Sequence, residues 1–297
     1  MKISAIVPTR HREAEVLRLL AGLRAQTRPP DEVLIVDGGD APLEGEAVAA
    51  AMAACPFPVR LLRESPGVCR QRNRGARESA GDLLFFFDDD VVPEPDFIEI
   101  LAEVFVRNPE YRAGMGTLAP AMRRWSPGAL LCRLFLLQRE HGDGRYYPSG
   151  MPRHPYGTGE FREVEVLGAG LMAVRRAVFA EDKVEFDERL PLMWEDVDFS
   201  RRLSRRGRLF FEPRARVEHS RSPAGRPDDF ERGRRYMLGY RRLYLQHFYP
   251  RAPWTLPAHW WALLGMFVVA AATGSRDALR GYADGFGEFS GMGLLKK

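Results

Sequence analysis

The feature that most constrains the fold is a regular alternation of short apolar runs and helix-like segments in the first third of the chain. The apolar runs are Ile3–Val7, Glu32–Val36, Val59–Leu62 and Leu83–Phe87, and the helix-like segments between them are Glu13–Gln26, Glu44–Ala54 and Val68–Ser79. Strands that alternate with helices favour a parallel sheet with helices packed on both faces. The sequence therefore predicts an α/β fold with a mostly parallel central sheet flanked by helices.

Two polar loops follow strands of this predicted sheet. Asp37-Gly38-Gly39 ends the second apolar run, and Asp88-Asp89-Asp90 ends the fourth. In open α/β sheets, ligands bind beyond the carboxyl ends of the strands. We therefore expect both loops to lie on the same rim of the sheet, beside a binding site.

The run Asp88-Asp89-Asp90 places three carboxylates side by side, and a divalent metal would compensate their mutual repulsion. In an extended chain, Asp88 and Asp90 point to the same side. Two carboxylates that leave other positions for phosphate and water suit Mg²⁺ or Mn²⁺. The alternative is an acidic loop that caps a helix beginning near Pro95.

A second acidic pair, Glu195-Asp196, stands at the start of a helix that is predicted to run to about Arg206. A carboxylate at such a position can serve as the general base if it reaches the hydroxyl of an acceptor. Acidic residues in a first helical turn also complement the helix dipole, so a purely structural role stays open.

The segment Gly67–Gly75 is rich in arginine and stands at the start of a predicted helix. Guanidinium groups match the oxygens of a diphosphate, so this segment is a candidate for donor binding. A solvated basic helix face is the alternative. The segment lacks the GxxxxGK[ST] pattern of the phosphate loop found in ATPases.

Together these segments resemble the family 2 glycosyltransferases, which have the GT-A fold, from Ile3 to about His219. The matching segments are Ile6-Val7-Pro8-Thr9-Arg10, Gln26-Thr27, Glu32–Gly38, Gly67–Gly75, Asp88-Asp89-Asp90, Gly168-Ala169-Gly170, Arg175-Arg176, Phe186-Asp187-Glu188, and Glu195-Asp196 with Arg201. The resemblance implies a metal-dependent, inverting transfer of a sugar from a nucleoside-diphosphate donor to a hydroxyl group. One departure is Gly38, where the family commonly has a second Asp.

The resemblance implies donor-binding roles near the N-terminus. Pro8, Thr9 and Arg10 would line the nucleotide pocket, and Glu13 would lie close to it. Asp37 would accept a hydrogen bond from the base, most naturally from N3–H of uracil or thymine. UDP and dTDP are therefore the favoured donor nucleotides.

The resemblance also implies roles around the acidic run. Arg72 would contact the base or the diphosphate, and Asp89 would face the ribose or the sugar. Asp90, with Asp88, would bind Mn²⁺ or Mg²⁺. His219 falls where some family members place a histidine near the metal.

The same comparison implies two catalytic residues. Asp196 matches the position of the general base, and Glu195 would orient the acceptor. A base on the acceptor side and a metal on the leaving-group side describe one in-line displacement, which inverts the anomeric carbon.

The chain is expected to divide at about residue 220. Residues 1–220 would form the GT-A domain, with a nucleotide-sugar half at 1–118 and an acceptor half at 119–220. Residues 221–297 would form a helical appendage associated with the membrane. In that appendage, Trp254–Thr273 is 20 residues long without formal charge, close to the length that crosses a bilayer. A span, a shallow hairpin and a dimerising helix pair all stay open.

Composition bears on location and partners. The three cysteines form no CxxC pair and are interpreted as reduced thiols, and the first apolar run is too short for a signal peptide. We expect a cytoplasmic protein at the inner face of the cell membrane, acting on a glycan or lipid-linked acceptor, as in polysaccharide synthesis. Net charge is only +4 and no readout module is present, so nucleic acid is not an expected partner.

Two other functions are compatible with parts of the pattern. A nucleotidyltransferase acting on sugar phosphates also uses acidic metal ligands on an α/β sheet, but it would need a Gly- and Lys-rich loop near the N-terminus. A non-catalytic sugar-binding relative is the other alternative, and the retention of Glu195-Asp196 together with the acidic run argues against it.

Overall fold

The computed structural model describes residues 1–119, 127–137, 141–190, 193–220 and 227–291. The strands are β1 Ile3–Thr9, β2 Glu32–Asp37, β3 Val59–Arg63, β4 Leu83–Phe87, β5 Val91–Pro93, β6 Tyr111–Ala119, β7 Arg162–Val164, β8 Leu171–Arg175 and β9 Arg208–His219. The helices are α1 Glu13–Arg24, α2 Glu46–Ala53, α3 Val68–Glu78, α4 Phe97–Arg107, α5 Pro127–Leu134, α6 Ala177–Ala180, α7 Glu195–Leu203, α8 Asp229–His247, a 3₁₀ turn at Pro253–Thr255, α9 Leu256–Ala272 and α10 Arg276–Gly291.

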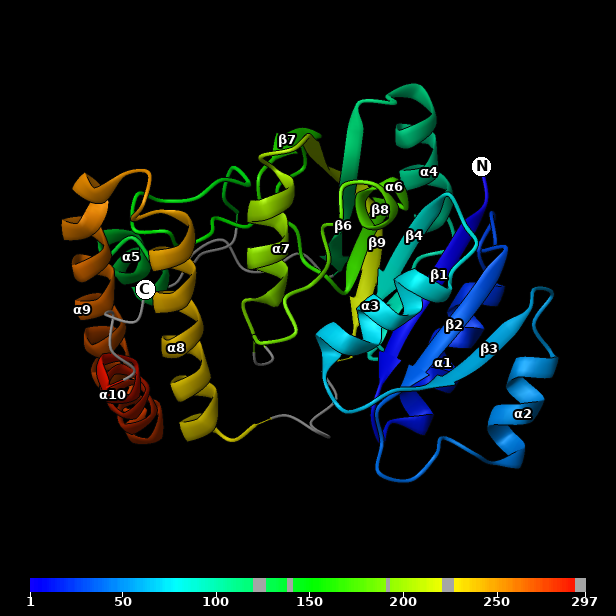
Figure 1. Ribbon diagram of the computed structural model, residues 1–297, viewed down its shortest axis with the longest axis horizontal. Helices are drawn as coiled ribbons and strands as arrows, with labels where there is room; N and C mark the ends of the chain where they lie inside the picture. Colours follow the sequence, from blue (N-terminus) through cyan, green and yellow to red (C-terminus); the bar gives the residue numbers. More distant parts are fainter. Residues whose placement is uncertain (120–126, 138–140, 191–192, 221–226, 292–297) are drawn as a thin grey trace.

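All described strands belong to one sheet with the order β3-β2-β1-β4-β8-β6-β9-β5, and β7 pairs with β9 (Figure 1). Strands β3, β2, β1, β4, β6 and β9 run in one direction, whereas β8, β5 and β7 run against them. Helix α3 packs on β1 and β2, and α4 packs on β6 and β9. The predicted α/β fold with a mostly parallel central sheet is therefore confirmed.

Strand β4 shows why the prediction succeeded in this half of the sheet. Its bounds, Leu83–Phe87, are those predicted from the apolar run, and all five side chains are buried. It lies between β1 and β8, so both edges are paired and both faces are covered. A strand in this position needs apolar residues throughout, which is the pattern that the sequence displays.

The second half of the sheet is less regular than the first. Strand β9 runs without a break from Arg208 to His219, although Pro213 lies inside it. Its register against β6 shifts between Phe211 and Arg216, so a bulge around Pro213 keeps the strand continuous. Residues 165–170 separate the short strand β7 from β8.

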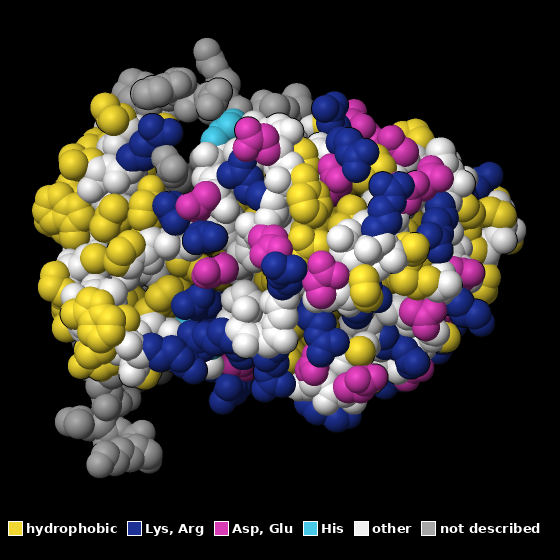
Figure 2. All heavy atoms as spheres, turned by 90° about the horizontal axis from the view of Figure 1, so that it is seen from above, with side chains coloured by type: hydrophobic (Ala, Val, Ile, Leu, Met, Phe, Trp, Pro, Cys, Tyr) yellow, Lys and Arg dark blue, Asp and Glu magenta, His cyan; other side chains and the backbone are white. Residues whose placement is uncertain are grey.

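A second apolar cluster lies beyond α7, at the end of the molecule opposite β3 (Figure 1). It combines residues of α8 and α9 with Trp194 and Val197 at the start of α7, and with Phe135 after α5. On α8, Tyr240 and Leu243 are buried in this cluster, so α8 is a packing helix. Figure 2 shows that hydrophobic side chains also gather on the surface of this end.

Candidate active site

The carboxyl ends of β1, β2 and β4 meet on one rim of the sheet, as their parallel register requires. Thr9 pairs with Asp37 at the last step of the β1–β2 register. Thr9 Oγ1 donates a hydrogen bond of 2.8 Å to Asp89 in the loop after β4. Gln71 Nε2 on α3 donates to the backbone oxygens of Thr9 and Val36, both at 2.7 Å, which joins α3 to the same rim.

Asp37 is buried at the end of β2, and its own loop surrounds its carboxylate. The backbone N–H groups of Gly39 and Leu43 each donate to it at 2.8 Å, and the Arg63 guanidinium pairs with it. These bonds give the loop after β2 its shape. The contact with a base that the family resemblance implies stays a prediction, and Asp37 is here engaged by protein groups.

The other residues expected around the nucleotide lie at the end of β1 and at the start of α1. Pro8 is buried within β1, whereas Arg10 and Glu13 are exposed. Arg10 forms an exposed ion pair of 3.3 Å with Asp40. Exposed pairs of this kind contribute little to stability, so Arg10 remains able to turn toward a ligand.

The three carboxylates after β4 each contact a basic side chain, and Arg12 lies within 4 Å of two of them. Asp88 lies 2.7 Å from Arg72 and Asp89 lies 2.8 Å from Arg12, while Asp90 Oδ1 lies 3.1 Å from His219 Nε2. Burial raises the pKa of Asp89, and Arg12 and Thr9 act against that rise. Basic side chains of the protein therefore compensate part of the repulsion among these carboxylates, for which the sequence analysis considered only a metal.

Asp90 and His219 remain the candidate metal ligands. Carboxylate oxygen and imidazole nitrogen are both donors that Mn²⁺ accepts, and here they are in contact. Asp88, about 40% exposed, is the most accessible carboxylate of the run. Within the described ranges, no group of three or more His, Cys, Asp and Glu side chains is arranged as a metal site, so bound phosphate or water would have to complete one.

Arg72 connects the acidic rim to α7. It is only 2% exposed, and it donates to Asp88 at 2.7 Å and to Glu195 at 3.1 Å. Burial alone would lower the pKa of Arg72, but the two carboxylates outweigh it and raise that pKa, so the group is a permanent cation. Its guanidinium carbon also lies 5.3 Å from the centre of the Phe186 ring.

The chain enters α7 through two residues in an unusual backbone conformation. Met193 and Trp194 have φ values of 98° and 73°, which residues other than Gly rarely adopt. The Met193 N–H donates to Glu195 Oε2 at 2.8 Å, which fixes this turn. Such strain persists only where the surrounding structure enforces it.

Helix α8 supplies that enforcement. Trp194 packs against Tyr236 and Tyr240, with ring centres 4.8 and 5.6 Å away. A Cβ atom at Gly239 would lie 2.5 Å from the Trp194 ring, so only glycine leaves room for the indole. Further along, His247 Nε2 lies 2.6 Å from Asp198 in a buried pair. Helix α8 thus holds α7 at both the entry turn and the middle.

Asp196 has the electrostatics expected of a general base that operates near neutrality. Desolvation by the surrounding protein, and then the neighbouring charge of Glu195, raise its pKa to about 7, while Arg72 acts in the opposite direction. Its Oδ1 accepts a hydrogen bond of 2.8 Å from the Val197 N–H. A carboxylate with such a pKa can accept a proton with little driving-force penalty.

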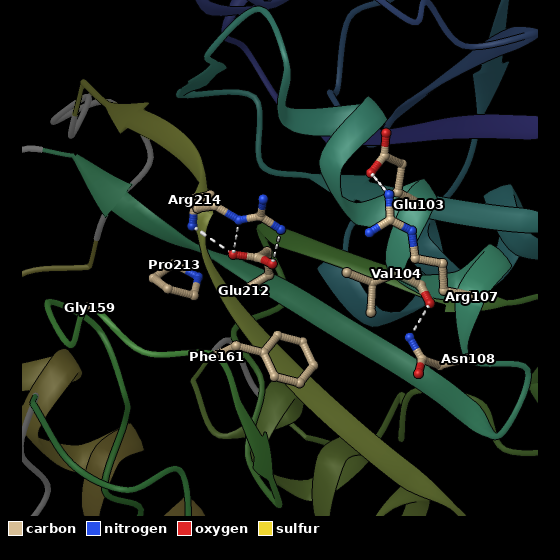
Figure 3. Close-up of a pocket in the computed structure, with 9 residues that line it drawn as sticks. All are labelled: Glu103, Val104, Arg107, Asn108, Gly159, Phe161, Glu212, Pro213 and Arg214. Atoms are coloured by element: carbon tan, nitrogen blue, oxygen red, sulfur yellow. Dashed lines mark hydrogen bonds and ion pairs between the residues drawn. The ribbon is translucent and has the colours of Figure 1, made fainter.

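The structure also contains two hollows away from this site. One, of about 360 Å³, lies between α4 and β9, where Phe161 points inward and Glu212 is paired with Arg214 (Figure 3). The other, of about 520 Å³, is lined by residues 141–143, 157–160 and 162. Neither hollow is lined by a residue that the sequence analysis assigns to the active site.

Sequence reasoning missed residues whose role depends on distant partners. Arg12 carries no motif of its own, yet it lies between Asp89 and Asp90 at 2.8 and 3.6 Å. Gly239 stands inside a helix, where an isolated glycine is the one local signal that a close approach occurs. That signal does not name Trp194 as the neighbour.

Comparison with known proteins places these features in a wider group. Residues 4–140 match the family described as Glycosyl transferase family 2. A protein of Haemophilus influenzae named an uncharacterized glycosyltransferase is 40% identical over 109 residues, which cover 36% of this chain and 35% of that protein. The glucosyl-dolichyl phosphate glucuronosyltransferase of Haloferax volcanii is 32% identical over 124 residues, covering 40% of this chain and 39% of its own. The matches thus span little more than a third of these relatives.

The fold also has counterparts among solved structures. The crystal structure of GalNAc-T7 with UDP, GalNAc and Mn²⁺ superposes with a TM-score of 0.62 over 86% of this chain and 51% of that chain. The two sequences are 15% identical, so the likeness shows the fold alone. That fold agrees with the GT-A type implied by the sequence motifs.

Proposed function

The chain belongs to glycosyl transferase family 2 through its residues 4–140, and from that premise we propose that it transfers a sugar from a nucleoside diphosphate to a hydroxyl of a glycan or lipid-linked acceptor. The observation that carries the proposal is Arg72, a buried cation that contacts both Asp88 and Glu195. It connects the rim, where the donor would bind, with the pair Glu195-Asp196, which would act on the acceptor.

The donor nucleotide would bind over the ends of β1 and β2. Pro8, Thr9 and Arg10 would line its pocket, with Glu13 at the edge, and Asp37 would meet the base after releasing one of its loop contacts. UDP and dTDP are favoured because each presents an N3–H donor to a carboxylate. Asp89, fixed by Thr9 and Arg12, would face the ribose or the sugar.

Asp90 and His219 would hold Mn²⁺ or Mg²⁺ together with Asp88, and the bound ion would neutralise charge on the leaving diphosphate. The protein itself already provides cations there. Arg72 and Arg12 lie against the same carboxylates and are charged at any physiological pH. They keep the rim from repelling a diphosphate before it binds.

The acceptor side would perform the proton transfer. Asp196 takes the hydroxyl proton as the acceptor oxygen forms its bond to the anomeric carbon. The bond from that carbon to the diphosphate breaks, and its electron pair leaves on the diphosphate oxygen. Glu195, held by Arg72 and the Met193 N–H, is placed to orient the acceptor. Attack opposite the leaving group inverts the anomeric carbon.

Two observations support a proposal for the acceptor and the location. Among the described residues, one helix, Pro253–Ala272, is long and apolar enough to cross a membrane, and a third of it is buried within the protein. The Haloferax relative is named for a lipid-linked sugar phosphate. Together these support a lipid-linked or polysaccharide acceptor at the inner face of the cell membrane.

Calorimetric titration of UDP, dTDP and GDP, each with Mn²⁺ and with EDTA, tests the proposal. We expect one nucleotide to bind tightly, and only with metal. Metal-dependent nucleotide binding with no sugar transfer to any acceptor would indicate a non-catalytic relative. Preference for a nucleoside triphosphate with a sugar phosphate would indicate a nucleotidyltransferase.

A further inference from the structure

The large hydrophobic side chains that the protein leaves exposed are concentrated on two helices. Leu130 and Leu134 on α5 are 61% and 60% exposed, and Trp254, at the turn before α9, is 74% exposed. Trp260, Trp261 and Leu264 on α9 continue the same surface. Figure 2 shows this apolar end clearly, with basic side chains beside it. We call these six residues the α5–α9 surface.

The two helices of this surface are joined by a hydrogen bond and by the packing of two aromatic rings. Trp261 Nε1 donates to the backbone oxygen of Leu134 at 2.8 Å, and its ring centre lies 4.8 Å from that of Phe135. Gly265 on α9 leaves space for the Phe135 side chain, which a Cβ atom would occupy. The surface therefore combines a helix from the acceptor half with one from the C-terminal region.

The opposite face of α9 is part of the protein core. His259 is buried, its ring lies 3.8 Å from that of Tyr244, and Nδ1 lies 3.4 Å from the Ser149 backbone oxygen. Burial lowers the pKa of His259 to about 3, so it stays neutral there. Met266 is buried on the same face. A helix that crossed a bilayer would have to abandon these contacts.

Charge is distributed as a membrane surface requires. Helix α9 contains no Lys, Arg, Asp or Glu, whereas exposed arginines stand on either side of it, at Arg251 and Arg276. Tryptophan is the residue most typical of the boundary between lipid headgroups and acyl chains, and arginine favours anionic headgroups. A helix with one apolar outer face and one face bound to protein suits binding in the plane of that boundary.

We propose that the α5–α9 surface binds an anionic phospholipid bilayer from one side, with α9 lying along the bilayer and α5 entering it as well. The proposal deepens the membrane location that we assign to the enzyme, and it excludes a transmembrane α9. Three tryptophans and three leucines would enter the interface, and Arg251 and Arg276 would contact phosphate groups.

Flotation of the full chain with vesicles tests this, without donor or acceptor present. We expect binding to vesicles of phosphatidylcholine with phosphatidylglycerol and weaker binding to phosphatidylcholine alone. Leu130→Glu should weaken binding by about tenfold or more, because one buried leucine is lost and a charge enters the interface. Trp254→Ser, at the most exposed position, should weaken it in the same direction. Val106→Glu is the matched control, since Val106 is 65% exposed on α4, outside this surface.

Three outcomes would overturn the proposal. Protein that resists alkaline carbonate extraction, with Leu130→Glu binding like the parent, would mean that α9 spans the bilayer. Absence of vesicle binding in every lipid mixture would reject a lipid partner. A dimer in sedimentation that Trp260→Glu converts to a monomer would identify a second copy as the occupant. Nucleotide titration of each variant reports folding and tests the donor site separately.

Discussion

The donor rim and the entry to α7 lie on either side of Arg72, yet they are built in opposite ways. The rim is made by the ends of strands in parallel register, and the sequence pattern of each strand is enough to locate the loop that follows it. The turn at Met193 and Trp194 has a strained backbone and is held by α8, more than 40 residues later. Substitutions in the C-terminal region should therefore impair catalysis while they leave donor binding unchanged.

The largest expected effect is on the acceptor side. Asp196→Asn removes the proposed base, so sugar transfer should fall by about 10²–10⁴. Binding of the donor nucleotide, measured by calorimetry, should be unchanged. Asp277→Asn, an exposed change on α10, serves as the control. Normal turnover in Asp196→Asn would place the base elsewhere and erase the functional difference between the two regions.

A change on the donor side should give the reverse pattern. Asp90→Ala removes a candidate metal ligand and the partner of His219, so affinity for the nucleotide in Mn²⁺ should drop. The loss should exceed the roughly 10–100-fold loss of metal affinity that follows when a residue hydrogen-bonded to a metal ligand is removed. Asp82→Ala at the other end of β4 is the control. Equal donor affinity with Mn²⁺ and with EDTA in the parent protein would already exclude the ligand role.

The contact between α8 and Trp194 should have an intermediate effect that separates the regions most sharply. Gly239→Ala forces the indole to move, and overpacking of this kind costs about 1–3 kcal/mol. We expect kcat to fall about tenfold and the donor Kd to stay constant. Gly287→Ala on α10, where a Cβ meets nothing within 4 Å, should leave both unchanged. Equal losses in donor binding and kcat would mean that α8 supports the whole domain.

The smallest expected effect is a shift in pH dependence. Because the pKa of Asp196 is raised to about 7, protonation removes the base as pH falls, so kcat/KM should decline below about pH 7. Glu195→Gln removes the neighbouring negative charge, so that decline should move to lower pH. A profile flat between pH 5 and 8 in the parent protein would contradict the assignment.

The same contrast explains what the sequence could predict. Apolar runs located β1 to β4, because a strand buried on both faces must be apolar along its length, and the loops after them followed from topology. The sequence also identified the acidic run and Glu195-Asp196. It could not show that Arg12 and Arg72 are the ions facing those carboxylates, because pairing depends on how distant segments meet. Likewise, the sequence did not single out Leu130, because its place on the α5–α9 surface depends on the packing of α5 against α9.

Gly239 belongs to the part of the chain that would be removed first to make the protein easier to handle. A version that ended near residue 220 would keep the sheet and the acidic rim but lose the helix against which Trp194 packs. A screen against this shortened protein would find compounds that compete with the nucleotide. It would miss compounds that act where the acceptor binds. Inhibitor screening should therefore use the whole chain, kept in lipid or a mild detergent.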